Sequence, residues 1–424
     1  MKTHYSLIAI VSLLMIIGTA CQKDVELVSP PEVEPEEQKE ESYGLPVVEI
    51  FTEAFQPVTS KETYVNGTIT VKDNGKKYTD GKEFKSAMRI KGRGNTTWQD
   101  PKKPYRIKLD EKASVLGLNK SKNWCLLAEY EDKSLLRNQT AMEISRICGM
   151  TWTPAMISVE VYLNNEYLGI YTFCENKEVA KNRVDIDLDK GDVYLELEQF
   201  MDNPVCFWTT HRLPVMFSNP EEPYNELKET VIQRFSDFEN VLYSENFADP
   251  ENGYAPMIDV ESVINYYIIQ ELTKNIDGNL RKSTFITLGP DSPLKFYHVW
   301  DFDRALGNCD YFPSEYPGTT NDNTGWFIKD QTLEHNEGWF ARFFKDPAFV
   351  SRLQQKWAEV YPLLRNVPSD FIDVKARELD TAQQRNFQKW QILGTETYRD
   401  KVQKMRDFYM KRLEWLNSEI PNLD

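Results

Sequence analysis

The chain has 424 residues, a hydrophobic fraction of 41%, 10 tryptophans and a formal net charge of −16. This length and apolar content predict a globular body that is large enough for one large or two ordinary domains. The acidic balance argues against nonspecific binding of nucleic acid, which requires a basic surface against the phosphates.

Residues 1–20 have the pattern of a lipoprotein signal peptide. A mildly basic start leads into an apolar run of roughly 13 residues, shorter than the ~20 that a membrane-spanning helix needs. The run ends in Gly18-Thr19-Ala20-Cys21, where small residues suit a peptidase and the cysteine can take a lipid through a thioether. We expect cleavage before Cys21 and lipidation of Cys21. An ordinary secretory signal with a chance cysteine is the alternative.

Residues 21–44 are rich in acidic side chains and proline. Such a segment buries too little apolar surface to offset its chain entropy, so we expect a disordered acidic tether. Asp24 and Glu26, close behind Cys21, resemble the surface-export signal of Bacteroidota lipoproteins. The globular body is therefore expected outside the cytoplasm, lipid-anchored to the outer membrane at the cell surface or on its periplasmic face.

Alternating segments in the first half predict strands, and helical spacing dominates the second half. Strands are expected at 46–51, 67–72, 86–91, 105–109, 157–163, 167–173, 192–198 and 294–300. Helices are expected after Asp132, which can act as an N-cap, from Asp259 onward, and in the segments that follow Phe343. Strands first and helices second, joined around residues 225–260, favour an α+β fold over a doubly wound sheet.

The cysteines and histidines give no sign of a familiar metal site or triad. Five cysteines follow Cys21 without a C-x-x-C pair, and most lie in apolar or aromatic runs, so we expect core residues. Three scattered histidines remain after the leader, which disfavours a histidine-based zinc site and a Ser-His-Asp triad.

The segment Trp300-Asp301-Phe302-Asp303 stands where a hydrophobic strand ends. Two carboxylates at positions i and i+2 can face one side and supply oxygen ligands to a hard cation such as Mg²⁺. Placing them so close is costly without a cation between them. A turn whose aspartates bond the backbone is an alternative of equal weight.

A second acidic signal lies upstream, in Asn275-Ile276-Asp277-Gly278-Asn279 at the end of the helix that follows Asp259. Its alternative is ordinary helix termination, with Gly278 at the C-cap. Yet an aspartate on a post-helical loop, then a strand, then an Asp-Phe-Asp turn is the layout of phosphoryl transfer in protein kinases. There one aspartate faces the acceptor hydroxyl and the later one binds Mg²⁺.

A glycine-rich turn, residues 91–98, follows a predicted strand and precedes a basic segment at residues 102–108. Glycines let backbone N–H groups approach a phosphate, and Arg93, Arg106 and Lys108 could neutralise its charge. A tight hairpin with exposed cations is the alternative.

These signals, in this order, resemble the CotH kinase family, named for the spore coat protein CotH. The resemblance spans roughly residues 45–360 and rests on seven segments. They are Arg89–Trp98, Lys103–Lys108, Lys122-Asn123-Trp124, Ser134–Asn138, Tyr167–Tyr171 with Glu175, Asn275–Gly278 and Val299–Asp303. Each segment is weakly specific alone, and the combination is highly specific.

The resemblance implies a two-lobed atypical protein-kinase-like fold, with a β-rich N-terminal lobe and a helical C-terminal lobe. Residues 45–360 would form the kinase-like domain, and residues 361–424 a C-terminal helical extension packed on it. It also implies ATP and Mg²⁺ as cofactors, and a protein substrate that offers Ser or Thr hydroxyls.

The family's site residues carry over to positions in this chain. Asp277 looks like the catalytic aspartate that orients or deprotonates the substrate hydroxyl, and Asp301 like the metal-binding aspartate, with Asp303 where kinases have glycine. Arg106 or Lys108 would contact phosphates together with Arg93. Glu175 or Glu198 would partner that cation or meet the nucleotide.

One departure concerns the second metal ligand. The family places an asparagine shortly after the catalytic aspartate, whereas here Asn279 comes too early and Lys282 or Ser283 occupies the expected place. Asn279 is therefore the nearest candidate for that ligand, and two-metal chemistry is in doubt.

The sequence is also compatible with two other classes of function. A non-catalytic surface protein that binds a glycan or protein is indicated by Trp326-Phe327, Trp339-Phe340 and nearby Tyr311, Phe312 and Tyr316, although core packing explains such residues better. A glycoside hydrolase could use Glu196 and Glu198 as its acid pair, but only their spacing supports it.

Overall fold

The computed structural model describes residues 44–309, 322–329, 332–333 and 336–424. Ser42–Asp424 form one compact unit. The predicted signal peptide, the lipidation site Cys21 and nearly all of the predicted tether lie outside the described residues, as do Tyr311, Phe312 and Tyr316. Within the described residues, no helix is both long and apolar enough to cross a membrane.

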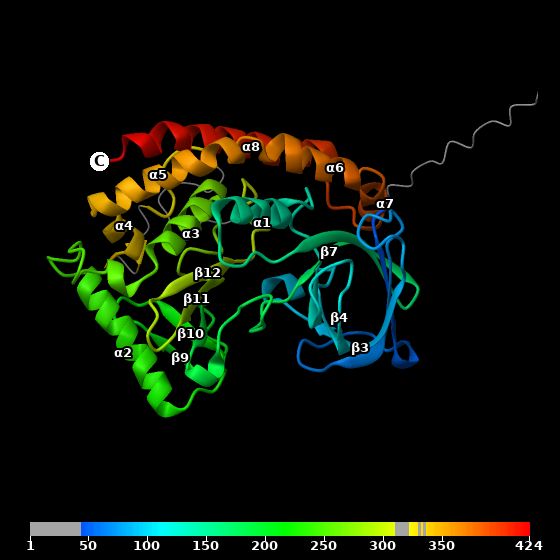
Figure 1. The fold of residues 1–424 in the computed structure, drawn as a ribbon. Coiled ribbons are helices and arrows are strands. Elements are labelled where there is room, and N and C mark those ends of the chain that lie inside the picture. Colours follow the sequence, from blue (N-terminus) through cyan, green and yellow to red (C-terminus); the bar gives the residue numbers. More distant parts are fainter. Residues whose placement is uncertain (1–43, 310–321, 330–331, 334–335) are drawn as a thin grey trace, which may run out of the picture. The chain divides into compact units, whose positions relative to one another are not determined.

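Seven strands of the first half close into a barrel (Figure 1). They are β1 (Val47–Thr52), β2 (Val65–Lys72), β3 (Phe84–Gly92), β4 (Tyr105–Ala113), β5 (Ser121–Leu127), β6 (Met156–Leu163) and β7 (Glu166–Glu175). β1 closes the barrel because it pairs antiparallel with β2 and parallel with β6, which sets Ile50 beside Ile69 and Leu163. Alternate apolar residues of these strands, such as Ile90 and Ile107, fill the interior.

Five later strands form a second, antiparallel sheet in the order β12-β11-β8-β10-β9. They are β8 (Val193–Leu197), β9 (Cys206–Trp208), β10 (Pro214–Asn219), β11 (Thr284–Leu288) and β12 (Lys295–Val299). A separate two-stranded ribbon joins β13 (Thr332–Leu333) to β14 (Asn336–Glu337). β8 and β11, at the centre of this sheet, are buried at every residue.

Helices cover this second sheet (Figure 1). The α-helices are α1 (Arg137–Cys148), α2 (Asn225–Leu242), α3 (Val260–Thr273), α4 (Trp339–Phe343), α5 (Pro347–Leu364), α6 (Asp373–Leu379), α7 (Ala382–Lys389) and α8 (Tyr398–Glu419). Short 3₁₀ turns occur at Glu53–Phe55, Thr96–Trp98, Leu188–Lys190, Ala255–Met257 and Ile420–Asn422, and a π-helical turn at Pro368–Ile372. α1 and α3 pack on β12, α5 contacts both of these helices, and α8 contacts α3, which gives a second hydrophobic core distinct from the barrel interior.

The expected two-lobed protein-kinase-like fold is wrong. The β-rich region is a closed seven-stranded barrel, and a second sheet with eight α-helices in the described part of the chain makes up the rest. Alternation along a strand shows which of its faces is buried, but it does not say which strands pair. The parallel pairing of β1 with β6, which joins segments about a hundred residues apart, closes the barrel.

Most individual elements agree with the sequence predictions to within a few residues, and six strands of the described residues were missed: β5, β9, β10, β11, β13 and β14. α3 begins where the sequence indicates, and the Asp259 carboxylate caps it by accepting a hydrogen bond from the Ser262 backbone N–H at 3.0 Å. α3 nevertheless ends at Thr273, and Lys274 rather than Gly278 takes the left-handed conformation at its C-terminus. The expected linker at 225–260 contains the 18-residue helix α2.

Candidate functional site

A single polar cavity of about 650 Å³ contains most of the predicted site residues. The glycine-rich segment after β3, the start of β4, the segments that follow β5, β7 and β8, and the turn after β12 all line it. Predicted residues on its wall are Arg93, Arg106, Glu198, Asp277, Asp301 and Asp303. Lys108, Glu175 and Asn279 are not on its wall.

Asp301 begins the turn that follows β12, and two asparagines hold this turn in place. Its backbone has φ of +68°, a left-handed conformation that is uncommon for a residue other than glycine. Asn275 Nδ2 donates a hydrogen bond to the Asp301 carbonyl at 3.1 Å, and the Phe302 N–H donates to Asn138 Oδ1 at 2.8 Å. Asn138 belongs to α1 and Asn275 to the loop after α3, so both helices fix the turn.

The carboxylates of this turn oppose one another's ionisation. Burial raises the pKa of Asp301, and the nearby charge of Asp277 raises it further. The pKa of Asp303 lies well above its ordinary range because the side chain is buried and Asp301 is close. Crowded carboxylates of this kind are stabilised by a cation that binds between them.

The donor set therefore suits Mg²⁺ as far as its chemistry goes. Mg²⁺ takes oxygen ligands and usually binds through one or two carboxylates, with water and substrate phosphates completing its shell. Asp301 and Asp303 provide two such carboxylates. Among the described residues no group of three or more acidic, cysteine or histidine side chains is arranged to hold a metal, so protein groups alone would not complete the shell.

Asp277 lies on the strained loop that follows α3. Lys274, Asn279, Leu280 and Ser283 all have positive φ in this loop. Backbone strain of this kind persists only where surrounding contacts enforce it, and it is common at functional sites. The Asp277 N–H donates to Asn275 Oδ1 at 3.2 Å, and Lys282 Nζ lies 2.8 Å from Asp277 Oδ1.

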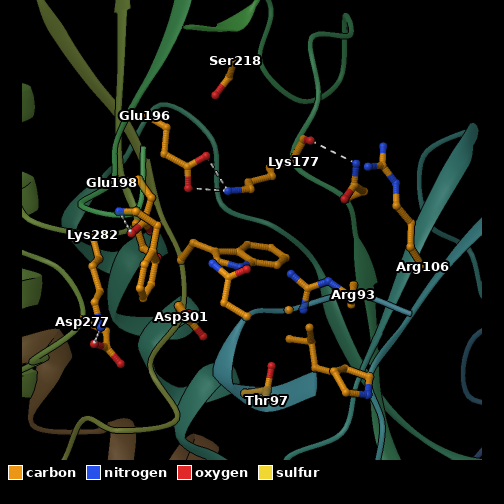
Figure 2. Close-up of a pocket in the computed structure, with 18 of the residues that line it drawn as sticks. Arg93, Thr97, Arg106, Lys177, Glu196, Glu198, Ser218, Asp277, Lys282 and Asp301 are labelled. Carbon is orange, nitrogen blue, oxygen red and sulfur yellow. Dashed lines mark hydrogen bonds and ion pairs between the residues drawn. The ribbon is translucent and has the colours of Figure 1, made fainter. Parts of the chain in front are cut away.

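Asn279, the candidate second metal ligand, has its side-chain amide turned into the same loop. Its Nδ2 donates to the Asn275 carbonyl at 2.6 Å, and the side chain is fully buried. Lys282, which stands nearer the family's asparagine position, does line the cavity. The structure thus pairs Lys282 with Asp277 on the cavity wall (Figure 2), whereas Asn279 does not line the cavity.

Cations from the barrel line the opposite side of the cavity (Figure 2). The Arg93 guanidinium lies 5.6 Å from the centre of the Trp300 ring, a cation–π distance. Arg106 Nε is buried without a hydrogen-bond partner among the described residues, as expected for a group whose partner is an anionic ligand. Of the two cations that the sequence left open, the structure therefore brings Arg106 to the cavity.

Two glycines shape the turn that carries Arg93. A Cβ on Gly92 would lie 2.4 Å from the Trp98 ring, so Trp98 packs flat against the chain only because Gly92 has no side chain. Gly94 has φ of +84°, and its Cβ would lie 2.2 Å from Thr97 Oγ1.

An ion pair that was not predicted from the sequence lies in the same cavity. Lys177 follows β7, and its Nζ lies 2.6 and 2.8 Å from the two carboxylate oxygens of Glu196 on β8. The ammonium also lies 4.3 Å from the centre of the Phe285 ring. The sequence indicated Glu196 only as half of a hydrolase acid pair. The one sequence signal for Lys177 as a site residue is a lysine shortly after a buried strand.

The two glutamates named as partners of the phosphate-binding cation lie in different environments. Glu198 lines the cavity, where burial first and the charge of Glu196 second raise its pKa to about 7. Glu175 is buried away from the cavity, where Oε2 accepts a hydrogen bond from the Ala155 N–H at 3.1 Å and Arg183 lies 4.0 Å from Oε1.

Carboxylates that face cations across a polar cavity have the chemistry of a site for a phosphate-bearing ligand bound with a hard cation. A family model described as CotH kinase protein matches residues 89–416, more than three-quarters of the chain. The chain belongs to the CotH kinase protein family, which confirms the resemblance inferred from its motifs. Membership indicates a kinase-like function and, in general terms, the use of ATP and a metal. A search of curated proteins gave no match.

Proposed function

We propose that this protein is an ATP- and Mg²⁺-dependent phosphotransferase that acts on Ser or Thr hydroxyls of a protein. The observation that carries the proposal is the shared cavity, in which Asp277 and Asp301 face Arg93 and Arg106. Carboxylates alone would suit many hydrolytic sites. The Nε of Arg106 has no hydrogen-bond partner among the described residues, which favours an anionic ligand in this cavity.

Each residue has a distinct role in this proposal. Asp277 orients the acceptor hydroxyl and accepts its proton, while Lys282 holds the Asp277 carboxylate in place. Arg93 and Arg106 bind the phosphates, and Asp301 and Asp303 would hold the metal. Bound Mg²⁺ supplies neutralisation of the phosphate charge. The Lys177–Glu196 pair provides a further cation on the cavity wall.

The decisive experiment is a calorimetric titration of the full chain with ATP, with and without Mg²⁺. We expect saturable binding that requires Mg²⁺ and is lost in Asp301→Ala. Asp407→Ala is the matched control, because Asp407 lies on the exposed side of α8 far along the chain from the cavity segments. Absence of heat with wild-type protein would remove the main support for a phosphotransferase.

Phosphate transfer itself separates an enzyme from a binding protein. Asp277→Asn should retain ATP binding but lose transfer to protein hydroxyls, measured with labelled ATP and a mixture of exported proteins. Retained transfer in this variant would show that Asp277 is not the residue that accepts the proton.

A non-catalytic surface-binding lipoprotein is the second candidate, and the position of Asn279 favours it because the second metal ligand is not at the cavity. The aromatic residues do not add support. Trp339, Phe327 and Phe340 are buried, and Trp326 packs against Trp415 with ring centres 5.0 Å apart. ATP binding without transfer in the wild type would favour this candidate, with a glycan or protein as its ligand.

In either case this protein would be lipid-anchored and would act outside the cytoplasm. We propose this location from the signal sequence and Cys21. Cys21→Ser should leave the protein unlipidated and released from the membrane fraction, which mass spectrometry and fractionation would show. Membrane-bound, unlipidated protein would contradict the anchor.

A further inference from the structure

We propose that Cys125 and Cys174 form a modification site, in which the two thiols of the folded protein are oxidised to a disulfide that alters the cavity. Cys125 lies on β5 and Cys174 on β7, directly opposite each other in the antiparallel register. Opposite residues of such a pair have Cα atoms about 4.5–5.5 Å apart, which falls within the range that a disulfide spans.

The pairing is specific to these two cysteines among the described ones. Cys148 lies on α1, Cys206 on β9 and Cys309 after the turn that follows β12, and none of these is opposite another cysteine in a strand pair. Cys125 and Cys174 are both completely buried, and they are cross-strand partners of β5 and β7. The strand pairing therefore brings the two cysteines side by side before any oxidation.

Groups around Cys125 make its thiolate available for exchange. The neighbouring Cys174 side chain lowers the pKa of Cys125 most, burial raises it, and Arg93, Arg106 and Arg183 lower it further. A thiolate is the form that attacks a disulfide. Two of these arginines belong to the cavity wall, so the sulfur pair lies close behind it.

The reaction uses an external disulfide as oxidant. The Cys125 thiolate attacks one sulfur of that disulfide and releases the other half as a thiol, which leaves a mixed disulfide. Cys174 then attacks the Cys125 sulfur and displaces the second half. Two protein thiols are oxidised, one external disulfide is reduced to two thiols, and the protons pass to the released thiolates.

The disulfide would change the hydrogen bonds of Asn176, a residue of the cavity wall. In the thiol form, Cys125 Sγ donates to Asn176 Oδ1 at 3.2 Å, and Asn176 Nδ2 donates to the Lys177 carbonyl at 3.0 Å. Asn176 lines the cavity, and Lys177 is held there by Glu196. In the disulfide, Cys125 carries no proton and cannot donate to Asn176, so the Asn176 amide beside Lys177 loses a contact that it has in the resting thiol form.

The site is tested by treating the folded full chain with oxidised glutathione and mapping disulfides by mass spectrometry. Trypsin leaves Cys148 and Cys174 in one peptide, since no Lys or Arg lies between Arg146 and Lys177, so cleavage at Glu160 must follow. We expect a Cys125–Cys174 link that is absent from Cys125→Ser and Cys174→Ser and present in the control Cys206→Ser. Circular dichroism shows whether each variant is folded. No link, or a link that forms only after denaturation or involves Cys148 or Cys206, would overturn the proposal.

The effect on the cavity rests on the proposed function and is measured separately, with pyrophosphate as the probe. The oxidised protein should bind pyrophosphate with Mg²⁺ at least threefold more weakly, dithiothreitol should restore the affinity, and Cys125→Ser should show no redox response. Equal affinity of the two forms would overturn the coupling. Failure of both forms to bind pyrophosphate would count against the proposed function, while a mapped disulfide would still support the modification site.

Discussion

Buried carboxylates in two regions of this protein are treated in opposite ways. Glu271 of α3 is fully buried against Arg412 of α8, with Nη2 and Oε1 2.6 Å apart. Its carboxylate also accepts backbone hydrogen bonds from Phe327, Ile328 and Lys329. Asp301 and Asp303 instead lie beside each other and Asp277, and each raises the energy of the other's charge.

This difference separates a structural carboxylate from functional ones. The charge of Glu271 is neutralised within the protein, and the ion pair joins α3 to α8. The aspartates of the turn after β12 remain poorly compensated, and a cation would stabilise them. Substitution should therefore have opposite effects on stability in the two regions.

The largest effect is expected from Arg412→Met, which leaves Glu271 buried without its cation. We expect the free energy of unfolding to fall by about 3–5 kcal/mol, measured by chemical denaturation. The control is Arg399→Met, because Arg399 pairs with Asp380 where the side chains are 81% and 46% exposed. That surface pair should contribute less than about 1 kcal/mol. Equal losses in the two variants would remove the distinction between the regions.

Asp301→Asn should weaken ligand binding and leave the protein folded. We expect Mg²⁺-dependent ATP binding to weaken by about a hundredfold, or roughly 2.7 kcal/mol. The free energy of unfolding should stay unchanged or rise, because one of the crowded negative charges is removed. A clear fall in stability would place Asp301 in the same structural class as Glu271.

The pH dependence of stability should expose the uncompensated charge of the cavity. Burial and Glu196 raise the pKa of Glu198 from 4.5 to about 7, so the folded protein binds the proton more tightly than the unfolded chain. The stabilising contribution is complete below about pH 4.5 and is lost as the pH rises through about 7, by roughly 3 kcal/mol.

Comparing wild type with Glu198→Gln isolates this contribution. Denaturation between pH 4 and 8 should show a smaller loss of stability with rising pH in the variant, and Mg²⁺ with ATP should offset part of the wild-type loss. Identical pH profiles would show that Glu198 keeps an ordinary pKa.

The smallest effect tests the cation side of the cavity. Arg106→Gln should weaken ATP binding about tenfold, or roughly 1.4 kcal/mol, because it removes a cation from the cavity wall. Lys108→Gln, two residues further along β4 and not on the cavity wall, should change the affinity less than twofold. Reversed effects would mean that Lys108 reaches the phosphates.

The local elements were predictable because their signals are local. Asp259 caps α3 and Gly149 ends α1 in a left-handed conformation, as the residue types indicate. Lys177 was missed because its role depends on an ion pair with Glu196, and Glu196 lies on a strand of the second sheet. The sequence did not predict that Asn279 lies off the cavity wall. The loop after α3 contains several residues in the left-handed conformation, which no spacing rule anticipates.

The sequence by itself determined the family, the alternating strands, and the order of an aspartate loop before an Asp-Phe-Asp turn. Only the tertiary structure decided that the first strands close into a barrel and which basic residue of β4 meets the cavity. Arg106 and Lys108 share one face of the strand, because side chains repeat every two residues. Their positions relative to the second sheet differ by two residues along β4, and that distance is set by the packing of segments far apart in the chain.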